Sequence, residues 1–257
     1  MAIFYFILIL VVLILVHEFG HFSIAKLFKI RVDEFGIGFP PRLLKIQIGE
    51  TLYSLNLLFF GGFVRIFGEN NEEGKGDPRS YASKPKTVQA AVLLAGIAFN
   101  ILFAWLAVSA GYMKGLPTSG EHESFGEVKN IETTVVSIVP GSPAQKAGIE
   151  SGDVISTIET GTAKLTDASA EEVRTFIADH QDESFVLSID REGEAKNFVL
   201  RAEEGVIEDR KAVGVQLGDV GILQLPPHLA LLEGARLTYD LTIATAEGLG
   251  AFFAQIA

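Results

Sequence analysis

The sequence predicts a polytopic α-helical membrane protein with a membrane-associated β-hairpin or sheet loop and an inserted α+β domain. Three features support this fold class: apolar stretches of spanning length, an apolar loop with strand-like alternation, and an acidic segment that mixes helix and strand patterns. Of the 257 residues, 48% are hydrophobic although 21% are charged, a combination that favours separate membrane and aqueous parts. We expect domains at 1–112, 113–225 and 226–257.

The first expected domain, 1–112, holds two spans joined by a loop at 29–86. The chain is apolar from its start through Val16, and the pattern resumes after residue 21, which gives the ~20 mostly apolar residues that a spanning helix needs. No basic segment precedes this run, so we do not interpret it as a cleaved signal peptide. The second span, about 88–112, contains no charged residue.

The last expected domain, 226–257, combines an amphipathic lead-in with a third span. Its apolar pattern starts near Leu229, and Glu233, Arg236, Asp240 and Glu247 interrupt it. The lead-in is suited to lie at the membrane interface. The pattern still runs at Ala257, so we interpret the third span, from Leu241 onward, as truncated.

The loop between the first two spans is too apolar for an ordinary connection. Residues 45–48 and 51–55 alternate around Gly49-Glu50 and predict a hairpin, and 63–67 predict another strand after Gly61-Gly62. We weigh two roles equally: a hairpin that shields a site in the first span, or a strand edge that binds an extended peptide. Residues 70–86, rich in glycine and proline, predict a flexible linker.

Charge gives the expected orientation. Basic residues of the loop cluster just after the first span and just before the second, so the positive-inside rule places the loop in the cytoplasm. Residues 112–228 hold 10 basic and 21 acidic residues, a balance of −11 that equals the net charge of the chain. This segment is therefore expected on the other side, and the acidic balance argues against a nucleic-acid partner.

The pattern His17-Glu18-Phe19-Gly20-His21 lies inside the first span, where charged groups are costly. Histidines four residues apart share one helix face, so both rings can bind one Zn²⁺ while Glu18 acts as general base. The structural alternative is a buried hydrogen bond between His and Glu on a face that packs against another helix. Because the chain has no cysteine, only histidine and carboxylate side chains remain as zinc ligands.

In the second span, Gly96 and nearby small residues predict close helix packing. Asn100 is the most polar interior group of this span. A helix–helix hydrogen bond and a contact with substrate or the active site are equally supported for it.

The acidic segment resembles a PDZ domain of the bacterial protease type. The resemblance rests on three motifs, which are 139–144 (VPGSPA), 147–149 (AGI) and 151–155 (SGDVI). Pro143 is expected at the start and Gly148 at the end of a short helix. Ser169 is expected to cap a second helix with Glu172 at its third position. PDZ domains bind peptides by strand addition, and an empty groove that only filters substrates by size is the alternative.

As a whole, the chain resembles the bacterial site-2 proteases, intramembrane zinc metalloproteases with one PDZ domain. The matching elements, in order, are 17–21, 35–40, 61–64 and 96–100. The resemblance implies that His17 and His21 bind zinc, that Glu18 is the general base, and that Asn100 holds substrate or organises the site. By the same resemblance, Gly61, Gly62, Phe63 and Val64 would bind substrate.

That family implies cleavage of transmembrane segments of membrane proteins in the bacterial inner membrane, with several passes through the lipid bilayer and the PDZ domain outside the cytoplasm. One departure stands out: the family's third zinc ligand, an aspartate in an Asp-Gly motif of a later span, has no counterpart, and Asp240 lacks its context. The alternative function is a membrane-tethered PDZ module without catalysis. An ion transporter is disfavoured because the spans offer few polar residues. Substrate identity and oligomeric state are not predicted.

Overall fold

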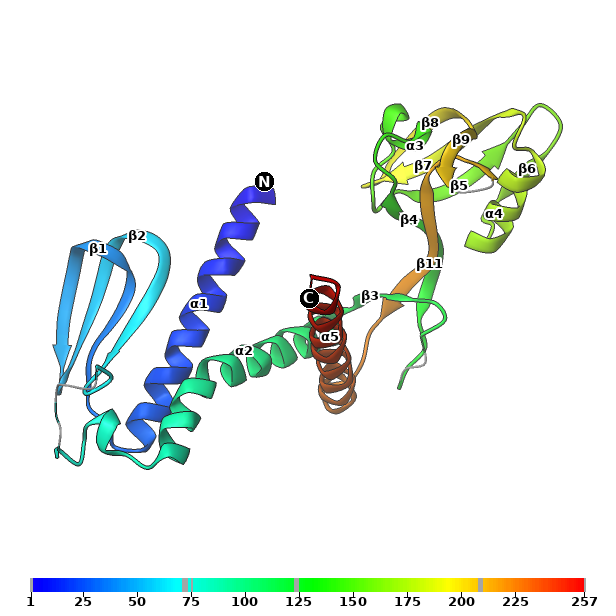
Figure 1. Ribbon diagram of the computed structural model, residues 1–257. Helices are drawn as coiled ribbons and strands as arrows, with labels where there is room; N and C mark the ends of the chain where they lie inside the picture. The colour runs from blue at the N-terminus through cyan, green and yellow to red at the C-terminus, as the bar shows by residue number, and fades with distance from the viewer. Residues whose placement is uncertain (1, 71–73, 75, 123–124, 208–209, 257) are drawn as a thin grey trace. The chain divides into compact units, whose positions relative to one another are not determined.

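A computed structural model describes residues 2–70, 74, 76–122, 125–207 and 210–256 (Figure 1). The chain divides into two compact units, Met1–Val108 with Gly234–Ala257, and Ser109–Glu233. Each unit is described by itself below. Positions 71–73 and 75 of the predicted linker lie outside the described residues.

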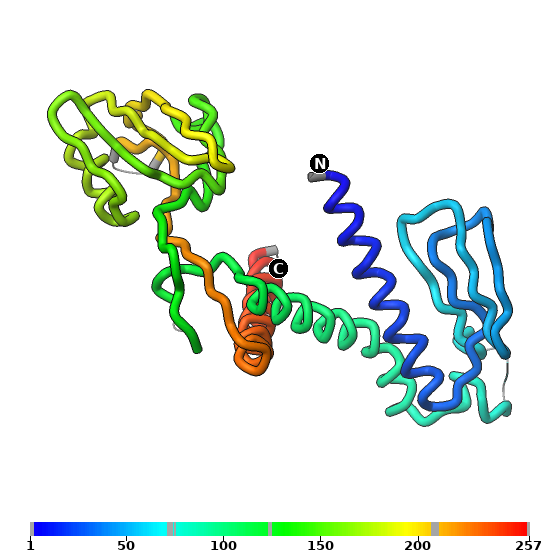
Figure 2. Tube along the Cα trace, turned by 180° about the vertical axis from the view of Figure 1, so that it is seen from behind, coloured from blue at the N-terminus to red at the C-terminus, as the bar shows by residue number. Residues whose placement is uncertain are grey.

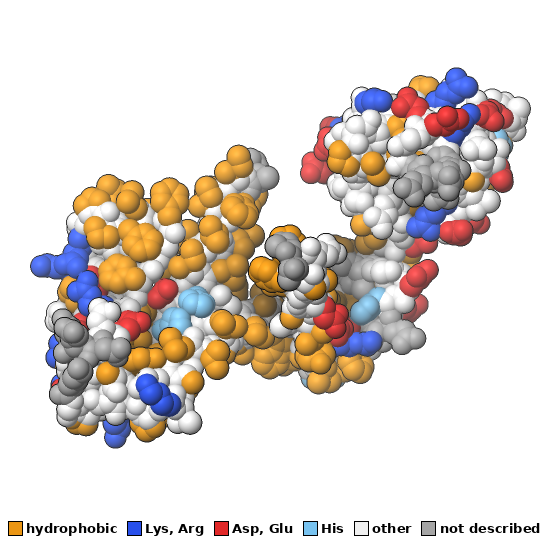
Figure 3. Space-filling model, in the orientation of Figure 1, with side chains coloured by type: hydrophobic (Ala, Val, Ile, Leu, Met, Phe, Trp, Pro, Cys, Tyr) orange, Lys and Arg blue, Asp and Glu red, His pale blue; other side chains and the backbone are white. Residues whose placement is uncertain are grey.

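The first unit begins with α1 (Ala2–Leu27), which η1 (Tyr81–Ser83) and α2 (Lys86–Lys114) follow further along the chain. Within these helices, Ile3–Leu27 and Lys86–Lys114 are long and apolar enough to cross a membrane. Each carries a lysine in its last turn, where a positive charge interacts favourably with the negative end of the helix dipole. Figure 3 shows hydrophobic side chains over most of the visible surface of α1.

The predicted fold class, a polytopic α-helical membrane protein, is wrong. Among the described residues only two helices pass the spanning criterion, and extensive antiparallel sheets occupy much of the rest. The expected third span belongs to α5 (Pro227–Ile256), one continuous helix in which Glu233, Arg236, Asp240 and Glu247 keep the apolar character low. The chain is a mixed α and β protein with two candidate spans.

The loop after α1 forms a two-stranded sheet of unusually long strands, β1 (Val32–Ile48) and β2 (Thr51–Ile66). Both strands fold back, so that the first half of β1 lies opposite both halves of β2: Glu34 faces Leu52 and also Arg65. The predicted hairpin around Gly49-Glu50 is confirmed, since Ile48 lies opposite Thr51. The sequence did not predict that each strand continues through a bend. Gly38, at φ +77°, lets the chain change direction inside β1 without ending the pairing.

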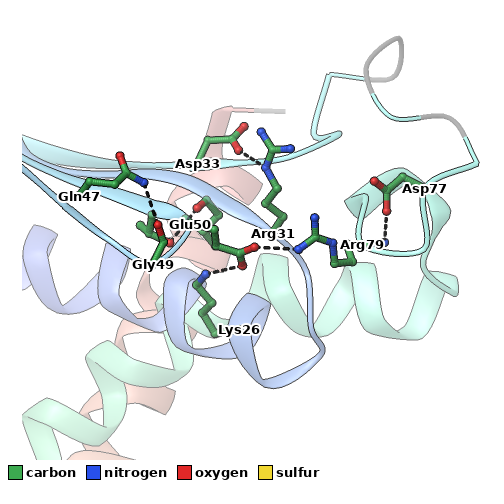
Figure 4. Close-up of polar contacts among 10 residues, drawn as sticks. Lys26, Arg31, Asp33, Gln47, Gly49, Glu50, Asp77 and Arg79 are labelled. Carbon is green, nitrogen blue, oxygen red and sulfur yellow. Dashed lines mark hydrogen bonds and ion pairs between the residues drawn. The ribbon is translucent and has the colours of Figure 1, made fainter.

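Polar contacts tie this sheet to the end of α1 (Figure 4). Glu50, at the β1–β2 turn, accepts hydrogen bonds from Lys26 Nζ and Arg79 Nη1, each at 2.8 Å. The hydrogen bond from Lys26, helped by the charges of Lys26 and Arg79, holds the pKa of Glu50 below its ordinary value. Because these groups are partly exposed, the contacts add little to the stability of the fold, but they fix the position of the β1–β2 turn against the end of α1.

The second unit is built on a seven-stranded sheet in the order β3-β11-β4-β5-β7-β8, with β6 paired to β5. A separate pair, β9 with β10, completes its strands, and Figure 2 shows the same trace from behind. The elements of this unit are β3 (Leu116–Ser119), β4 (Lys129–Ile138), α3 (Pro143–Ala147), β5 (Val154–Glu159), β6 (Lys164–Thr166), α4 (Ala170–Asp179), β7 (Ser184–Arg191), β8 (Glu194–Arg201), β9 (Glu203–Ile207), β10 (Arg210–Ala212) and β11 (Val215–Leu223).

The predicted ends of both short helices in this unit are confirmed. Pro143 lies in the first turn of α3, and Gly148 ends the helix at φ +91°. Ser169 and Glu172 form a reciprocal capping box at the start of α4. α4 then buries Val173 and Phe176 against the sheet, so that one face of this amphipathic helix closes the core.

Candidate metal and catalytic site

The two histidine rings of α1 converge, as their spacing predicts. His17 Nε2 and His21 Nε2 lie 3.1 Å apart, with the ring planes at 77°. The carbonyl oxygen of Val92 in α2 lies 2.7 Å from His21 Nδ1. This contact places the proton on Nδ1, because a carbonyl can only accept, and leaves Nε2 as an acceptor. A backbone carbonyl behind a ligating histidine is the usual support of a metal site.

Two glycines let α2 approach this close. A Cβ built on Gly96 would lie 2.5 Å from His17 Nε2 and 2.6 Å from His21 Nε2. A Cβ on Gly20 would lie 2.6 Å from the carbonyl oxygen of Ala95. The predicted close packing at Gly96 is thus confirmed, and its missing side chain leaves the space in front of both ring nitrogens.

Glu18 points toward the sheet. Its side chain is half-buried, and its Cγ would be 3.4 Å from a Cβ on Gly62 of β2. The backbone N–H of Val64, two residues along the same strand, lies near the Glu18 carboxylate. The general-base candidate, Glu18, therefore lies between the histidine pair and the second half of β2. It is one residue from His17 and three residues from His21.

The four residues of the predicted substrate segment divide between the two faces of β2. Gly62 and Val64 lie on the side of Glu18, as the contacts above show. Phe63 lies on the other face, where its ring covers Gly36 and stacks on Phe39 with the ring centroids 6.4 Å apart. Gly61 lies against the Phe39 ring: a Cβ built on Gly61 would lie 2.7 Å from Cε2 of Phe39. Strand alternation explains the split.

Asn100 occupies the same face of α2 as Val92 and Gly96, one turn further along the helix. Its Oδ1 is buried and has no hydrogen-bond partner among the described residues. No helix–helix hydrogen bond to this oxygen is therefore seen, which leaves an acceptor for a group outside the described structure.

The histidine pair fits zinc as part of a ligand set. Two neutral imidazoles with the tautomer fixed on one ring are typical zinc donors, and no bulky side chain blocks them. Within the described parts of the chain, no group of three His, Cys, Asp or Glu side chains could hold a metal ion. Asp240 is exposed on α5 and lies in no such group.

Sequence reasoning missed the support around this site. The Val92 carbonyl cannot be identified from side-chain chemistry, and Gly20 was named only as part of the motif. A signal was available for Gly20: a glycine in a helix interior costs stability relative to alanine and so indicates close packing.

The second unit contains a pocket between α4 and the first half of β11. It measures about 300 Å³. Ile177, Val213, Val215 and Leu217 form its apolar wall, while Arg174 Nη2 donates to the Leu217 carbonyl at 2.5 Å. A strand and a helix thus flank this pocket.

Comparison with known proteins supports a zinc metalloprotease. The sequence model of "Peptidase family M50" matches residues 5–256. A "Putative zinc metalloprotease" of Thermotoga maritima is 36% identical over 216 residues, covering 80% of this chain and 40% of that protein. One of Clostridium perfringens is 41% identical over 160 residues, covering 60% and 42%. The chloroplastic "Membrane metalloprotease ARASP" of Arabidopsis thaliana is 30% identical over 230 residues, covering 88% and 47%. The chain spans about half the length of the curated relatives it matches.

Proposed function

Because this chain belongs to peptidase family M50, we propose that it supplies two zinc ligands and the general base of a membrane metalloprotease that cleaves transmembrane segments of other proteins. One observation carries the proposal: two ring nitrogens 3.1 Å apart, beside a half-buried glutamate, inside a helix that is apolar enough to span a membrane. The names of the relatives above support zinc and proteolysis.

In this proposal His17 and His21 hold the zinc ion through their Nε2 atoms. When bound, zinc supplies Lewis acidity toward water and toward the scissile carbonyl. The Val92 carbonyl holds His21 in the required tautomer. Further ligands come from outside the described residues.

Glu18 performs the proton transfer. Its carboxylate takes a proton from the attacking water and returns it to the nitrogen of the leaving amine as the peptide bond breaks. The backbone of Gly62 and Val64 borders Glu18 and limits the positions of its carboxylate. Glu18 lies one residue from His17 and three residues from His21, so helix geometry keeps the base and both ligands within about one turn of each other.

The strand edge at Gly62–Val64 binds the substrate in extended form. A peptide bond inside a helix has its carbonyl hydrogen-bonded and shielded, so the substrate must unwind before it can be cleaved. A strand edge offers backbone partners to an unwound segment that reaches it. The free Asn100 Oδ1 accepts a substrate N–H group in the same step.

This activity takes place within the bacterial inner membrane, which α1 and α2 cross. The end of α1 at Lys26, the start of α2 at Lys86 and the β1–β2 sheet between them face the cytoplasm, and the acidic second unit lies outside it. Bound lipid and transmembrane substrates are the partners that this arrangement implies.

The test uses the full-length protein in detergent with a reporter whose transmembrane segment carries a donor–acceptor dye pair. Glu18→Gln keeps size and hydrogen bonding but cannot act as a base, so cleavage falls to background. Glu247→Gln, on the exposed surface of α5, is the matched control and retains the wild-type rate. Cleavage by the Glu18→Gln protein at the wild-type rate would overturn the role of Glu18.

The groove beside α4 favours a second, compatible function, binding of a peptide by the PDZ-like unit. Its apolar wall suits a hydrophobic side chain, and its strand edge suits an added strand. A fluorescent peptide that ends in Val-Ala would bind with its free carboxylate more tightly than as the amide. Equal binding of the two forms, or none, contradicts peptide capture and supports the size-filter alternative.

A further inference from the structure

The β1–β2 sheet contains a buried carboxylate to which the proposed mechanism assigns no role. The side chain of Glu34 is only 3% exposed. Arg42 Nη2 and Ser54 Oγ donate to its Oε1 at 2.6 and 2.7 Å, and Arg65 Nη1 lies 3.7 Å from its Oε2. A buried charge is tolerated only with such partners, and losing one of them is costly.

These partners come from every part of the folded sheet. Glu34 lies in the first half of β1 and Arg42 in the second half, while Ser54 lies in the first half of β2 and Arg65 in the second half. One carboxylate therefore connects all four strand segments. Asn56, which is 1% exposed, extends the network by donating to the carbonyls of Ile37 and Gly38.

The network lies on the face of the sheet that points away from α1. Phe35 and Tyr53 lie with their ring centroids 5.4 and 6.1 Å from that of Phe22 in α1, so they mark the α1 face. Side chains alternate between faces along a strand, which puts their neighbours Glu34 and Ser54 on the opposite face. The network cannot touch Glu18 and can act only through the backbone.

The connection through the backbone is short. Arg65 Nη1 lies 3.7 Å from Glu34 Oε2 on one face. Gly62, three residues earlier on the same segment, lies against Glu18 on the other face, with its built Cβ 3.4 Å from Glu18 Cγ, and the Val64 N–H lies near the carboxylate. A shift of Arg65 along its strand therefore shifts the backbone that borders the general base.

We propose that Glu34 is a positioning residue, whose buried carboxylate fixes the strand edge Gly62–Arg65 against Glu18. The inference rests on the proposed protease function for its consequence in catalysis, and on geometry alone for the position of the edge. Arg42 and Arg65 neutralise the carboxylate and at the same time set the spacing between the outer segments.

The first experiment measures the edge directly, by hydrogen–deuterium exchange of the full-length protein in detergent. Glu34→Gln should increase exchange in 62–66 by about tenfold, because it weakens hydrogen bonds to a charged group. Glu34→Asp keeps the charge and should restore part of the protection. Asp33→Asn is the matched control: Asp33 is the adjacent carboxylate, bonded to Arg31, and its loss should leave 62–66 unchanged.

The second experiment measures turnover of the dye-labelled transmembrane reporter described above by the same proteins. Glu34→Gln should lower kcat by about tenfold with KM within about twofold, as expected for a displaced general base. Glu34→Asp should recover part of kcat, which a loss of folded protein alone would not produce. Unchanged exchange in 62–66 for Glu34→Gln, or an equal increase for Asp33→Asn, overturns the proposal. If wild-type protein does not cleave the transmembrane reporter and Glu18→Gln behaves identically, the protease function fails, and the exchange experiment still decides the role of Glu34.

Discussion

Gly96→Ala tests the metal site most sharply, because one methyl group would enter the space in front of both histidines. The added Cβ would lie 2.5 Å from His17 Nε2 and Cε1, and 2.6 Å from His21 Nε2. These distances fall about 1 Å short of an ordinary van der Waals contact of about 3.5 Å. Neither ring can rotate freely, since the Val92 carbonyl holds His21 and His21 borders His17.

The expected result is a large loss of zinc affinity without loss of the fold. Ligand distances in zinc sites tolerate only about 0.2 Å, so a displacement near 1 Å removes at least one ligand. We expect zinc affinity to fall by about 100-fold or more, beyond the range for a lost outer-shell contact. Competition with a chromophoric chelator on the full-length protein measures it.

The control for this variant is Gly111→Ala, in the same helix. It gives the same gain in helix propensity, about 1 kcal/mol, and its Cβ would meet only the flexible end of Leu116 at 3.1 Å. It should keep wild-type zinc affinity. Wild-type affinity in Gly96→Ala would refute the assignment of the two Nε2 atoms as metal donors.

Three further predictions concern stability. Gly20→Ala places a Cβ 2.6 Å from a backbone oxygen that cannot rotate away, and should lower the free energy of unfolding by about 1–3 kcal/mol in detergent, whereas Gly250→Ala, which meets nothing within 4 Å, should not. Asp219→Ala removes the acceptor of the Thr133 hydroxyl and the Ala170 amide, both at 2.8 Å, and should cost the second unit about 1–3 kcal/mol by thermal unfolding. Arg191→Met leaves Asp153 charged at 1% exposure and should cost about 3 kcal/mol; unchanged melting temperatures would contradict each argument.

The Asp153–Arg191 pair also fixes a pH dependence. Burial alone raises the pKa of Asp153, but the hydrogen bonds from Arg191 and the Glu150 amide, with the Arg191 charge, outweigh burial and lower it. A folded-state pKa below the ordinary value of about 3.9 means that the stabilisation is present above that pH and is lost as the pH falls through the lowered value. Asp153→Asn should therefore flatten the acid limb of a stability–pH curve below about pH 4.

Residue spacing was sufficient to predict the local parts of the site. Two histidines one turn apart share a helix face, so the approach of their rings follows from helix geometry. The capping box at Ser169 and Glu172 and the helix end at Gly148 are equally local, and the structure confirms them. The roles of His17, Glu18 and His21 in catalysis stay predictions until the variants above are measured.

Local patterns predicted the hairpin itself but not the long-range pairing around it. The strands expected at 45–48 and 51–55 do pair, with Ile48 opposite Thr51. No local pattern showed that Glu34 would lie opposite both Leu52 and Arg65. The third predicted span failed because hydrophobic length alone does not outweigh four charged residues spread along α5.

The sequence by itself determined which residues can bind a metal and move a proton, because that chemistry belongs to the side chains and their spacing along one helix. Only the tertiary structure decided what holds them in place. The Val92 carbonyl behind His21, the space that Gly96 leaves, and the link from Glu34 through Arg65 and Val64 to Glu18 join residues far apart in the chain. Such contacts depend on how strands and helices pack, and periodicity along the chain carries no record of them.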